Sequence, residues 1–347
     1  MKKFTKILSL VLCLLMTLSL LLACSSNKDE AQNNANADEN KAQALEGDFY
    51  DENGLRYMAL DTTEKTCEVS VGNAKSLKEI VIPATYQGYT VTNIAQAGFA
   101  DCENLESVTI PDSVIAIGDL AFQNCTKLAT VKLSGKAGLK KIGNAALKNT
   151  ALYNNENNWQ DGVLYLGKYL IEVDDSLTAC TIKEGTTVIA GYAFYGCKDL
   201  VSITVPKSLK YIDSFAFNNC KALKKVYITD LKAWCSMEFA NYLVNPLALN
   251  TNSELYLNGT LVTHLVLTSD ITSISDYAFY GYRTMTDLTI STSLKTIGEK
   301  AFEGVTLNAN TTEGIYHIFF EGTEKQWKAV SKASAGLPGN DHISFKE

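Results

Sequence analysis

The chain has 347 residues, of which 46% are hydrophobic and 20% are charged. This is the composition of a globular protein large enough for one long core or two domains, rather than of a disordered or fibrous chain. The formal net charge is −7, and no cluster of basic residues interrupts the acidic balance. Nucleic acid and anionic membrane surfaces are therefore excluded as favoured partners, because both attract positively charged proteins.

The first 23 residues have the pattern of an export signal. A positive start is formed by three lysines: Lys2, Lys3 and Lys6. An apolar run over residues 7–22 follows, and it is too short for a comfortable spanning helix. The run ends in LLAC at residues 21–24, which resembles the bacterial lipobox. The resemblance implies cleavage before Cys24 and a thioether-linked diacylglycerol on that cysteine. A plain signal peptide with an incidental cysteine is the alternative.

Residues 24–46 are polar, acidic and nearly free of apolar side chains. Such a segment cannot bury enough surface to offset the entropy of ordering, so we expect it to be disordered. Behind a lipidated Cys24 it would act as a tether that holds a folded domain away from the outer face of the cell membrane. Because two acyl chains give stable anchoring, no second membrane segment is needed.

A short apolar pattern, L-x-x-I-x-V or a close variant, recurs at a fixed step through the rest of the chain. Its first residues stand 23 positions apart within three runs: Leu105 and Leu128; Leu177, Leu200 and Leu223; Val262 and Met285. A further copy starts at Leu77, and a second pattern, Ala-Phe-x-x-Cys, keeps the same step at Phe194 and Phe217. A fixed period of this size is typical of a repeat protein.

One unit of this length cannot bury its own apolar side, whereas stacked units can, each about 4.8 Å above the last. In the unit that begins at Leu200, alternation turns Ile203 and Val205 inward and Thr204 outward. Pro206 then ends the strand, because proline cannot donate to the ladder of hydrogen bonds. The sequence predicts a mostly β protein with short helices, built as a solenoid of 23-residue units with hairpin insertions and terminal caps.

We expect this solenoid to span residues 47–347. Its parts would be a hairpin cap at 54–71, repeats at about 77–152, an insertion at about 153–176, repeats at 177–228, an insertion at about 229–261, repeats at 262–308, and a C-terminal cap at 314–347. Both insertions contain a two-residue-turn hairpin pattern, within Leu164–Ile171 and Leu255–Val262. A short helix is expected at 230–239 with Asp230 as its N-cap, and a capping box at Thr323 opens another.

The repeat unit, L-x-x-V-x-I-P-x-x-V-x-x-I-x-x-x-A-F-x-x-C, resembles the leucine-rich repeats of the BspA-like bacterial surface proteins. Residues 105–125, 200–220 and 285–302 match it most closely. The resemblance covers about residues 55–347 and implies a leucine-rich-repeat solenoid. It also implies a surface protein that takes part in adhesion or partner binding. The departures from the unit are a few single positions: Leu147, Thr150, Thr268, Tyr282 and Ser291.

The outward strand positions are the candidate ligand face. If the strands align, these positions form one ladder rich in hydroxyl groups: Thr109, Lys132, Thr181, Thr204, Tyr227 and Thr289, flanked by His264. Threonine is also favoured on exposed strands for packing alone, so an inert sheet face would look similar. The insertions with Trp234 and Trp327 are a rival site, although both tryptophans would also serve as core anchors.

The sequence contains no motif typical of catalysis, of a cofactor site or of a metal site. The three histidines are far apart, and no two cysteines have the C-x-x-C spacing. Residues 154–161 are rich in oxygen ligands but lack the spacing of a known calcium loop, so a solvated insertion is the better interpretation. Seven cysteines are expected to be free and buried: Cys67, Cys102, Cys125, Cys180, Cys197, Cys220 and Cys235.

The sequence therefore indicates an exported, membrane-anchored surface protein that binds an extracellular protein or glycan and has no catalytic activity and no cofactor. One alternative is a hydrolase of cell-wall or host glycans, with a carboxylate pair such as Asp174 and Asp175 in an insertion. Another is a purely structural protein of the cell envelope.

Overall fold

The computed structural model describes residues 49–134, 138–305, 317–332, 334–337 and 342–346. The expected signal peptide at 1–23, the lipidated Cys24 and the tether at 24–46 lie outside the described residues. Residues Leu45–Glu347 form one compact unit with a continuous hydrophobic core, which makes this part of the chain suitable for study as a separate protein. Within the described ranges, every helix is too short or too polar to cross a membrane.

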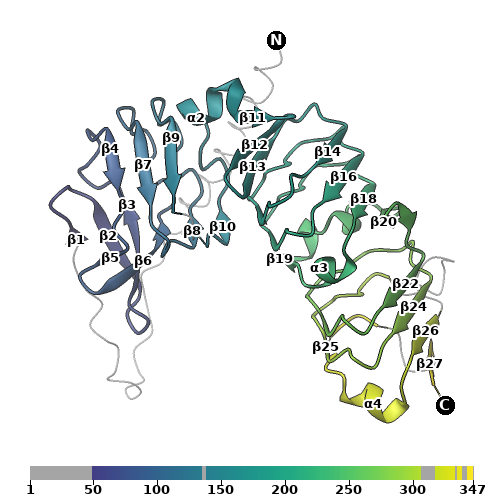
Figure 1. Cartoon of the computed structure of the whole chain (residues 1–347). Helices are drawn as coiled ribbons and strands as arrows, with labels where there is room; N and C mark the ends of the chain where they lie inside the picture. Colours follow the sequence, from purple (N-terminus) through teal and green to yellow (C-terminus); the bar gives the residue numbers. More distant parts are fainter. Residues whose placement is uncertain (1–48, 135–137, 306–316, 333, 338–341, 347) are drawn as a thin grey trace, which may run out of the picture. The chain divides into compact units, whose positions relative to one another are not determined.

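The predicted solenoid is confirmed: the chain is mostly β, with a few short helices and a repeat of about 23 residues. The leucine pattern forms a row of short strands that pair in parallel within three sheets (Figure 1). The first sheet contains β4 (Glu79–Val81), β7 (Ser107–Ile110) and β9 (Thr130–Leu133). The second contains β14 (Ala179–Thr181), β16 (Ser202–Val205), β18 (Lys225–Ile228), β20 (Glu254–Leu257) and β21 (Thr260–Leu261). The third contains β22 (His264–Leu267), β24 (Asp287–Ile290), β26 (His317–Phe320) and β27 (Ile343–Phe345).

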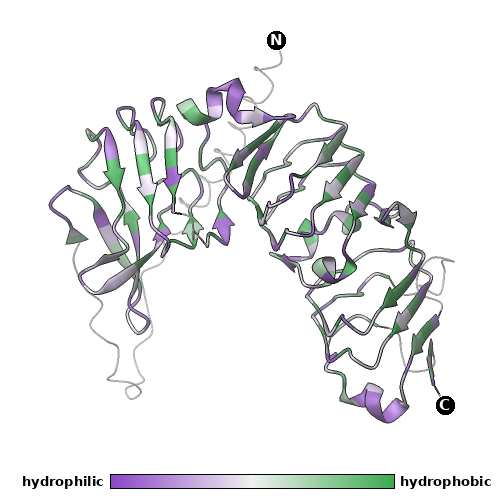
Figure 2. Cartoon of the chain, viewed as in Figure 1, coloured by the Kyte–Doolittle hydropathy of each residue, from purple (hydrophilic) through white to green (hydrophobic). Residues whose placement is uncertain are grey.

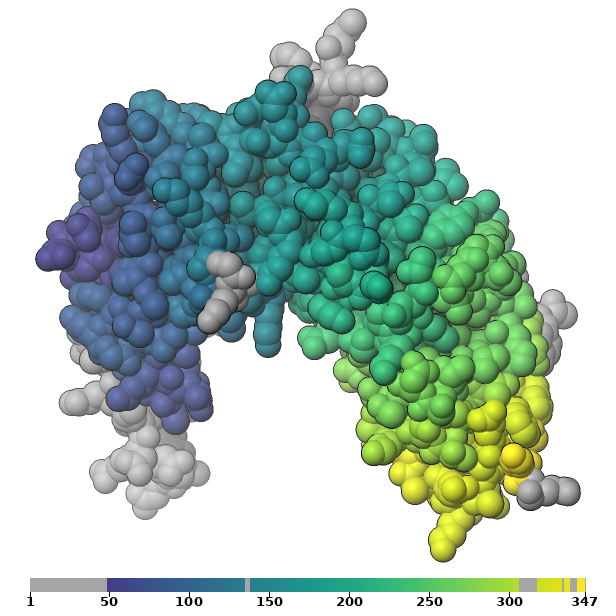
Figure 3. Space-filling view, in the orientation of Figure 1, coloured from purple at the N-terminus to yellow at the C-terminus, as the bar shows by residue number. Residues whose placement is uncertain are grey.

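Side chains alternate along these strands as expected. Ile203 and Val205 are buried and Thr204 is partly exposed, and Pro206 follows the last residue of β16. Figure 2 shows hydrophobic and hydrophilic residues alternating along β4, β7 and β9. In the space-filling view of Figure 3, colours succeed one another in chain order, as they do when each repeat packs mainly on its neighbours.

The phenylalanines of successive repeats stack inside the core. The ring centroids of Phe194 and Phe217 are 4.7 Å apart. Two other pairs, Phe99 with Phe122 and Phe279 with Phe302, each have centroids 5.3 Å apart. All six rings are fully buried. The 23-residue step therefore places equivalent aromatic side chains on top of one another, which is the packing that the period predicts.

A second row of shorter strands was not predicted. Between the long strand and the phenylalanine, each regular repeat has a second apolar pattern, such as Leu209-x-x-Ile212. In the structure, the last two residues of this pattern form a two-residue strand. With the N-terminal strands, they form a sheet containing β1 (Phe49–Tyr50), β2 (Arg56–Asp61), β3 (Thr66–Ser70), β5 (Thr85–Tyr86), β6 (Tyr89–Ile94), β8 (Ala116–Ile117) and β10 (Lys141–Ile142). The next such sheet contains β11 (Trp159–Gln160), β12 (Val163–Leu166), β13 (Tyr169–Val173), β15 (Val188–Ile189), β17 (Tyr211–Ile212) and β19 (Glu238–Phe239). The last contains β23 (Ser273–Ile274) and β25 (Thr296–Ile297).

Antiparallel hairpins, among them β5 with β6, accompany the repeats. β2 pairs with β3 beside the first repeats, β12 pairs with β13, and β20 pairs with β21. The last hairpin turns at Asn258 and Gly259, whose φ angles of 51° and 81° are both left-handed. A two-residue turn of this kind requires positive φ at both central positions, which explains the Asn-Gly pair.

The helices are short: α2 (Ala151–Asn154), α3 (Leu231–Cys235) and α4 (Glu324–Ala329). Asp230 caps α3 by accepting a hydrogen bond of 2.8 Å from the Ala233 amide, and the capping box at Thr323 is present. Both predicted helix starts are thus confirmed. The expected helix over 230–239 is too long, because residues after Cys235 become extended and form β19, which pairs with β17.

Two departures from the repeat unit have structural reasons. Thr150 stands at a cysteine position, and its hydroxyl accepts a 3.1 Å hydrogen bond from the Tyr153 amide as the N-cap of α2. Tyr282, at another cysteine position, donates to the Val262 carbonyl at 2.6 Å and accepts from the Leu255 amide at 3.3 Å. Each replacement supplies a side-chain hydroxyl that forms hydrogen bonds with the backbone at a neighbouring insertion.

We predict that Phe217→Ala lowers the free energy of unfolding by about 3–5 kcal/mol, because it leaves a large cavity in the stacked core. The neighbouring Phe215 is the matched control: it is 42% exposed and Phe217 is fully buried. Urea unfolding of residues 45–347 should show a large loss for Phe217→Ala and little change for Phe215→Ala. Equal midpoints for Phe217→Ala and the unmodified protein would contradict the stacked core.

Candidate functional site

The predicted ligand face is divided among three sheets, so the expectation of one ladder is wrong. Thr109 pairs with Lys132 in the first sheet, and Thr181 pairs with Thr204 in the second. Tyr227 continues the second sheet, whereas His264 and Thr289 lie in the third. The structure brings these residues together only within each sheet.

The insertions cause this division. After the first sheet, the chain forms α2 where the next strand would stand, and the Leu152 amide donates to the Leu128 carbonyl at 2.8 Å. At the end of the second sheet, β20 folds back on β21 in antiparallel pairing before β22 begins the third. The periodicity of the repeats cannot show this, because the spacing on each side of an insertion stays regular.

The second sheet has the most developed outward face. Its parallel register aligns four residues in one column: Thr181, Thr204, Tyr227 and Tyr256. The rings of Tyr227 and Tyr256 stack with centroids 4.8 Å apart and an interplanar angle of 23°. The Tyr256 hydroxyl donates to Glu254 at 2.7 Å, and Glu254 also forms a 2.9 Å salt bridge with Lys224. These contacts hold an aromatic pair on the surface of the sheet.

Sequence analysis missed Tyr256, because the second insertion was not treated as part of the ladder. A signal was present, since Leu255-Tyr256-Leu257 alternates as Val226-Tyr227-Ile228 does. The register confirms the equivalence, with Tyr227 opposite Tyr256.

The third sheet presents histidine and hydroxyl groups. His264 Nε2 and Thr289 Oγ1 form a hydrogen bond of 2.8 Å, and His317 Nε2 and Ser344 Oγ form another of 2.9 Å. Asp287 lies between the two histidines in the register of the strands. Both histidines are exposed, and the same face also carries the exposed apolar side chain of Val266.

The tryptophans of the second insertion and the C-terminal segment are core residues. Trp234 and Trp327 are each 2% exposed. The Trp234 indole donates to the Ala278 carbonyl at 2.9 Å, which fixes the insertion on the next repeat. Neither indole is accessible to a ligand, and the rival site would depend on other residues of these segments.

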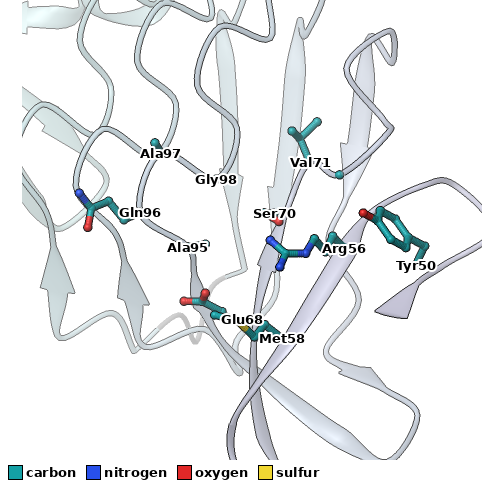
Figure 4. A pocket seen from close by; sticks show the side chains of 11 residues that line it. Tyr50, Arg56, Met58, Glu68, Ser70, Val71, Ala95, Gln96, Ala97 and Gly98 are labelled. Atoms are coloured by element: carbon teal, nitrogen blue, oxygen red, sulfur yellow. The ribbon is translucent and has the colours of Figure 1, made fainter. Parts of the chain in front are cut away.

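A polar cleft of about 780 Å³ lies over the outward side of the N-terminal hairpin. Figure 4 shows Arg56 between Tyr50 and Glu68, with Ser70 and Gln96 along the same cleft. Burial raises the pKa of Glu68, and the nearby Arg56 lowers it in part. The cleft therefore offers hydrogen-bonding and charged groups to a ligand, and sequence analysis did not identify it.

Asp174, of the suggested carboxylate pair, and Asn155, of the oxygen-rich segment, each accept local hydrogen bonds. Asp174 accepts hydrogen bonds from the amide and the hydroxyl of Ser176 at 2.8 and 2.7 Å, as a turn residue does. Asn155 accepts a 3.1 Å bond from the Asn157 amide and caps a short 3₁₀-helix. Across the ranges that the structure describes, no three His, Cys, Asp or Glu side chains are grouped so that they could hold a metal ion.

Comparison with known families decides the identity of the repeats. A family model described as "BspA type Leucine rich repeat region (6 copies)" matches residues 48–173, 165–253 and 249–320. The chain belongs to this family. The resemblance seen in the repeat unit is thereby confirmed over most of the chain.

Several solved structures are similar to this BspA-type protein, and two of the three that follow are described as leucine-rich proteins. The T. pallidum leucine rich repeat protein is 22% identical, with 73% of this chain and 87% of that chain covered and a TM-score of 0.31. A leucine rich cell surface protein from Faecalibacterium prausnitzii is 18% identical, with 84% and 98% covered and a TM-score of 0.33. The pneumococcal vaccine antigen PcpA is 16% identical, with 85% and 98% covered and a TM-score of 0.27. No curated protein sequence matches the chain.

The cysteines of the BspA-type repeats lie in the core. Four occupy the same repeat position and are all buried: Cys102, Cys125, Cys197 and Cys220. The thiols of Cys125 and Cys220 each donate to the carbonyl of the phenylalanine one repeat earlier, at 3.0 Å. Burial also raises the pKa of Cys67 and of Cys180 to about 11, which keeps these thiols neutral and unreactive.

We predict that a thiol reagent labels the folded protein slowly and labels all seven described cysteines after denaturation, because every one is free and buried. The measurement is a count of labelled sites in residues 45–347 by intact mass, without reductant, in buffer and in guanidinium chloride. Fewer than seven labels in the denaturant would show that some cysteines are paired.

Proposed function

We propose that this BspA-type protein is exported, anchored to the outer face of the cell membrane through a lipid on Cys24, and binds an extracellular protein or glycan without catalysis. The observation that carries the proposal is the stacked pair of Tyr227 and Tyr256 on the outward face of the second sheet. The binding surface is the outward face of the long-strand row.

Core requirements do not explain this tyrosine pair. The neighbouring inward residues Val226 and Leu255 are fully buried and close the interior beneath the sheet. Tyr227 and Tyr256 are only partly buried, so part of each side chain stays in contact with solvent. Large, rigid aromatic side chains with a polar hydroxyl are favoured contacts at binding surfaces, because they bury much area at a low entropic cost.

The solenoid also separates the residues needed for stability from those available for recognition. Each strand sends alternate side chains inward to the stacked core, so the outward positions can differ between repeats without disturbing it. Parallel pairing then aligns the outward positions of successive repeats into columns, such as the one from Thr181 to Tyr256. A column of hydroxyl and aromatic groups suits an extended polar partner.

The support for the anchor comes from the sequence. The lysines, the apolar run and LLAC at residues 21–24 stand in the order of a lipoprotein signal, and an acidic polar stretch follows. A lipid at Cys24 would fix the start of the mature chain at the bilayer, and residues 25–46 would give the solenoid reach.

We predict that residues 45–347 bind a partner on an array of extracellular matrix proteins and surface glycans. Tyr227→Ala and Tyr256→Ala should each weaken this binding about tenfold, because each removes half of the aromatic pair. Tyr211→Ala, which changes a partly buried tyrosine in the other row of strands, is the matched control. Undiminished binding of both test variants to the same partner would refute the outward face. An absence of any saturable binding would favour a structural protein of the envelope.

We also predict that the full-length protein, expressed in a bacterium with lipoprotein processing, is recovered with the membranes and carries a diacylglycerol on Cys24. Cys24→Ala should abolish incorporation of labelled palmitate and prevent signal cleavage before that position, because the lipid is attached to the thiol. Intact mass measures the signal cleavage and the lipid on Cys24, and membrane fractionation measures whether the protein stays with the membranes. Wild-type protein in the medium with an unmodified Cys24 would show that the anchor is absent.

A further inference from the structure

A second open cleft lies beside the second insertion, away from the strand faces. It has a volume of about 350 Å³, and its lining includes five aromatic or polar residues: Tyr242, Asn250, Tyr280, Arg283 and Glu303. We call it the tyrosine cleft. Its volume falls within the range of about 300–1,000 Å³ that is typical of small-molecule sites.

The walls of the tyrosine cleft are held in place by a buried amide. Asn245 is fully buried, and its side-chain nitrogen donates to the carbonyls of Tyr277 at 2.6 Å and Ala278 at 3.1 Å. Its side-chain oxygen accepts from the Leu247 amide at 2.9 Å. One residue thus fixes the 3₁₀ turns of the insertion, which carry Tyr242, against the repeat turn that leads to Tyr280.

Glycines leave the cleft open. Gly281 has a φ of 72°, and a Cβ added there would lie 3.1 Å from Ala248 Cα. Gly304 has a φ of 78°, and a Cβ there would lie 3.4 Å from Gly281 Cα. Side chains at these two positions would be strained and would occupy the space between the walls.

Tyr242 and Tyr280 form the aromatic wall of the cleft, and Tyr277 packs beside them outside its lining. The ring centroids of Tyr242 and Tyr280 are 4.9 Å apart, and Tyr277 lies 6.3 Å from Tyr242 and 6.4 Å from Tyr280. The Lys300 ammonium is 5.7 Å from the centre of the Tyr242 ring. Tyr242 keeps 37% of its surface exposed, so it presents aromatic surface to solvent, whereas Tyr277 packs against the core.

Planar polar groups complete the cleft. Arg283 is exposed and is one of only two arginines in the whole sequence, the other being Arg56 in the polar cleft over the N-terminal hairpin. Glu303 lines the cleft as well, and Asn250 is held by a bond from its amide to the Leu223 carbonyl. Guanidinium and carboxylate groups both form paired hydrogen bonds with fixed geometry.

We propose that the tyrosine cleft is a saccharide-binding site. A sugar ring has an apolar C–H face that packs on aromatic rings and a rim of hydroxyl groups that donate and accept hydrogen bonds. Tyr242 and Tyr280 supply the first kind of contact, and Arg283 and Glu303 supply the second. A peptide bound as an added strand needs a free strand edge, whereas the cleft is lined by turns and 3₁₀ residues.

The tyrosine cleft is a different surface from the outward strand face, so the two proposals can fail separately. A sugar bound in the tyrosine cleft would be a ligand in addition to the partner of the outward strand face.

The test is an array of mucin-type O-glycans, glycosaminoglycan fragments and bacterial wall glycans, probed with residues 45–347 and followed by calorimetric titration of the best-bound glycan. Tyr280→Ala and Arg283→Gln should each weaken its affinity about tenfold. Tyr195→Ala is the matched control, because Tyr195 follows Phe194 as Tyr280 follows Phe279 and is 39% exposed. Its affinity should stay within about twofold of the unmodified protein.

Arg283→Gln changes an exposed side chain, so it keeps the test decisive if Tyr280→Ala fails to fold. Binding of no glycan by the unmodified protein overturns the tyrosine cleft, while the protein array still tests the strand face. Glycan binding that survives both cleft variants and is lost in Tyr227→Ala also overturns the cleft and leaves the proposed function standing.

Discussion

Parallel pairing of equivalent residues is the constraint on which the structure depends. Because one strand lies about 4.8 Å from the next, side chains that recur every 23 residues are placed directly over one another. Ile203 pairs with Val226, and Phe194 stacks on Phe217 at 4.7 Å. A large apolar side chain in one repeat therefore packs against the equivalent side chain of the next repeat. The core extends as a column along the row of repeats instead of closing around one centre.

The insertions modify this column by adding polar anchors at their junctions. Thr150 supplies the cap of α2, and the Tyr282 hydroxyl joins the second insertion to the following repeat. Asn245 is fully buried yet satisfied, because it bonds two carbonyls of the next repeat turn. Buried polar groups of this kind are costly unless paired, and their pairing specifies where each insertion lies.

The solenoid needs only half of each strand for its core, so the residues proposed for recognition are separate from those that stabilise the fold. Outward columns, such as the one that contains Tyr227 and Tyr256, are aligned by the same register that builds the interior. The tyrosine cleft arises differently, where an insertion meets a repeat turn and glycine keeps the space open. Aromatic surface thus appears at two kinds of place: the sheet face and the junction of an insertion.

The sequence by itself determined the period, the inward and outward alternation, the hairpin turn at Asn258 and the caps of α3 and α4, because each is a local relation between nearby residues. The tertiary structure alone decided that the outward face is divided among three sheets, that Tyr256 joins Tyr227, and that Tyr242 meets Tyr280. These depend on contacts between segments that insertions separate. Spacing records the repeat step, but it does not record whether the chain forms a strand or α2 at a given step.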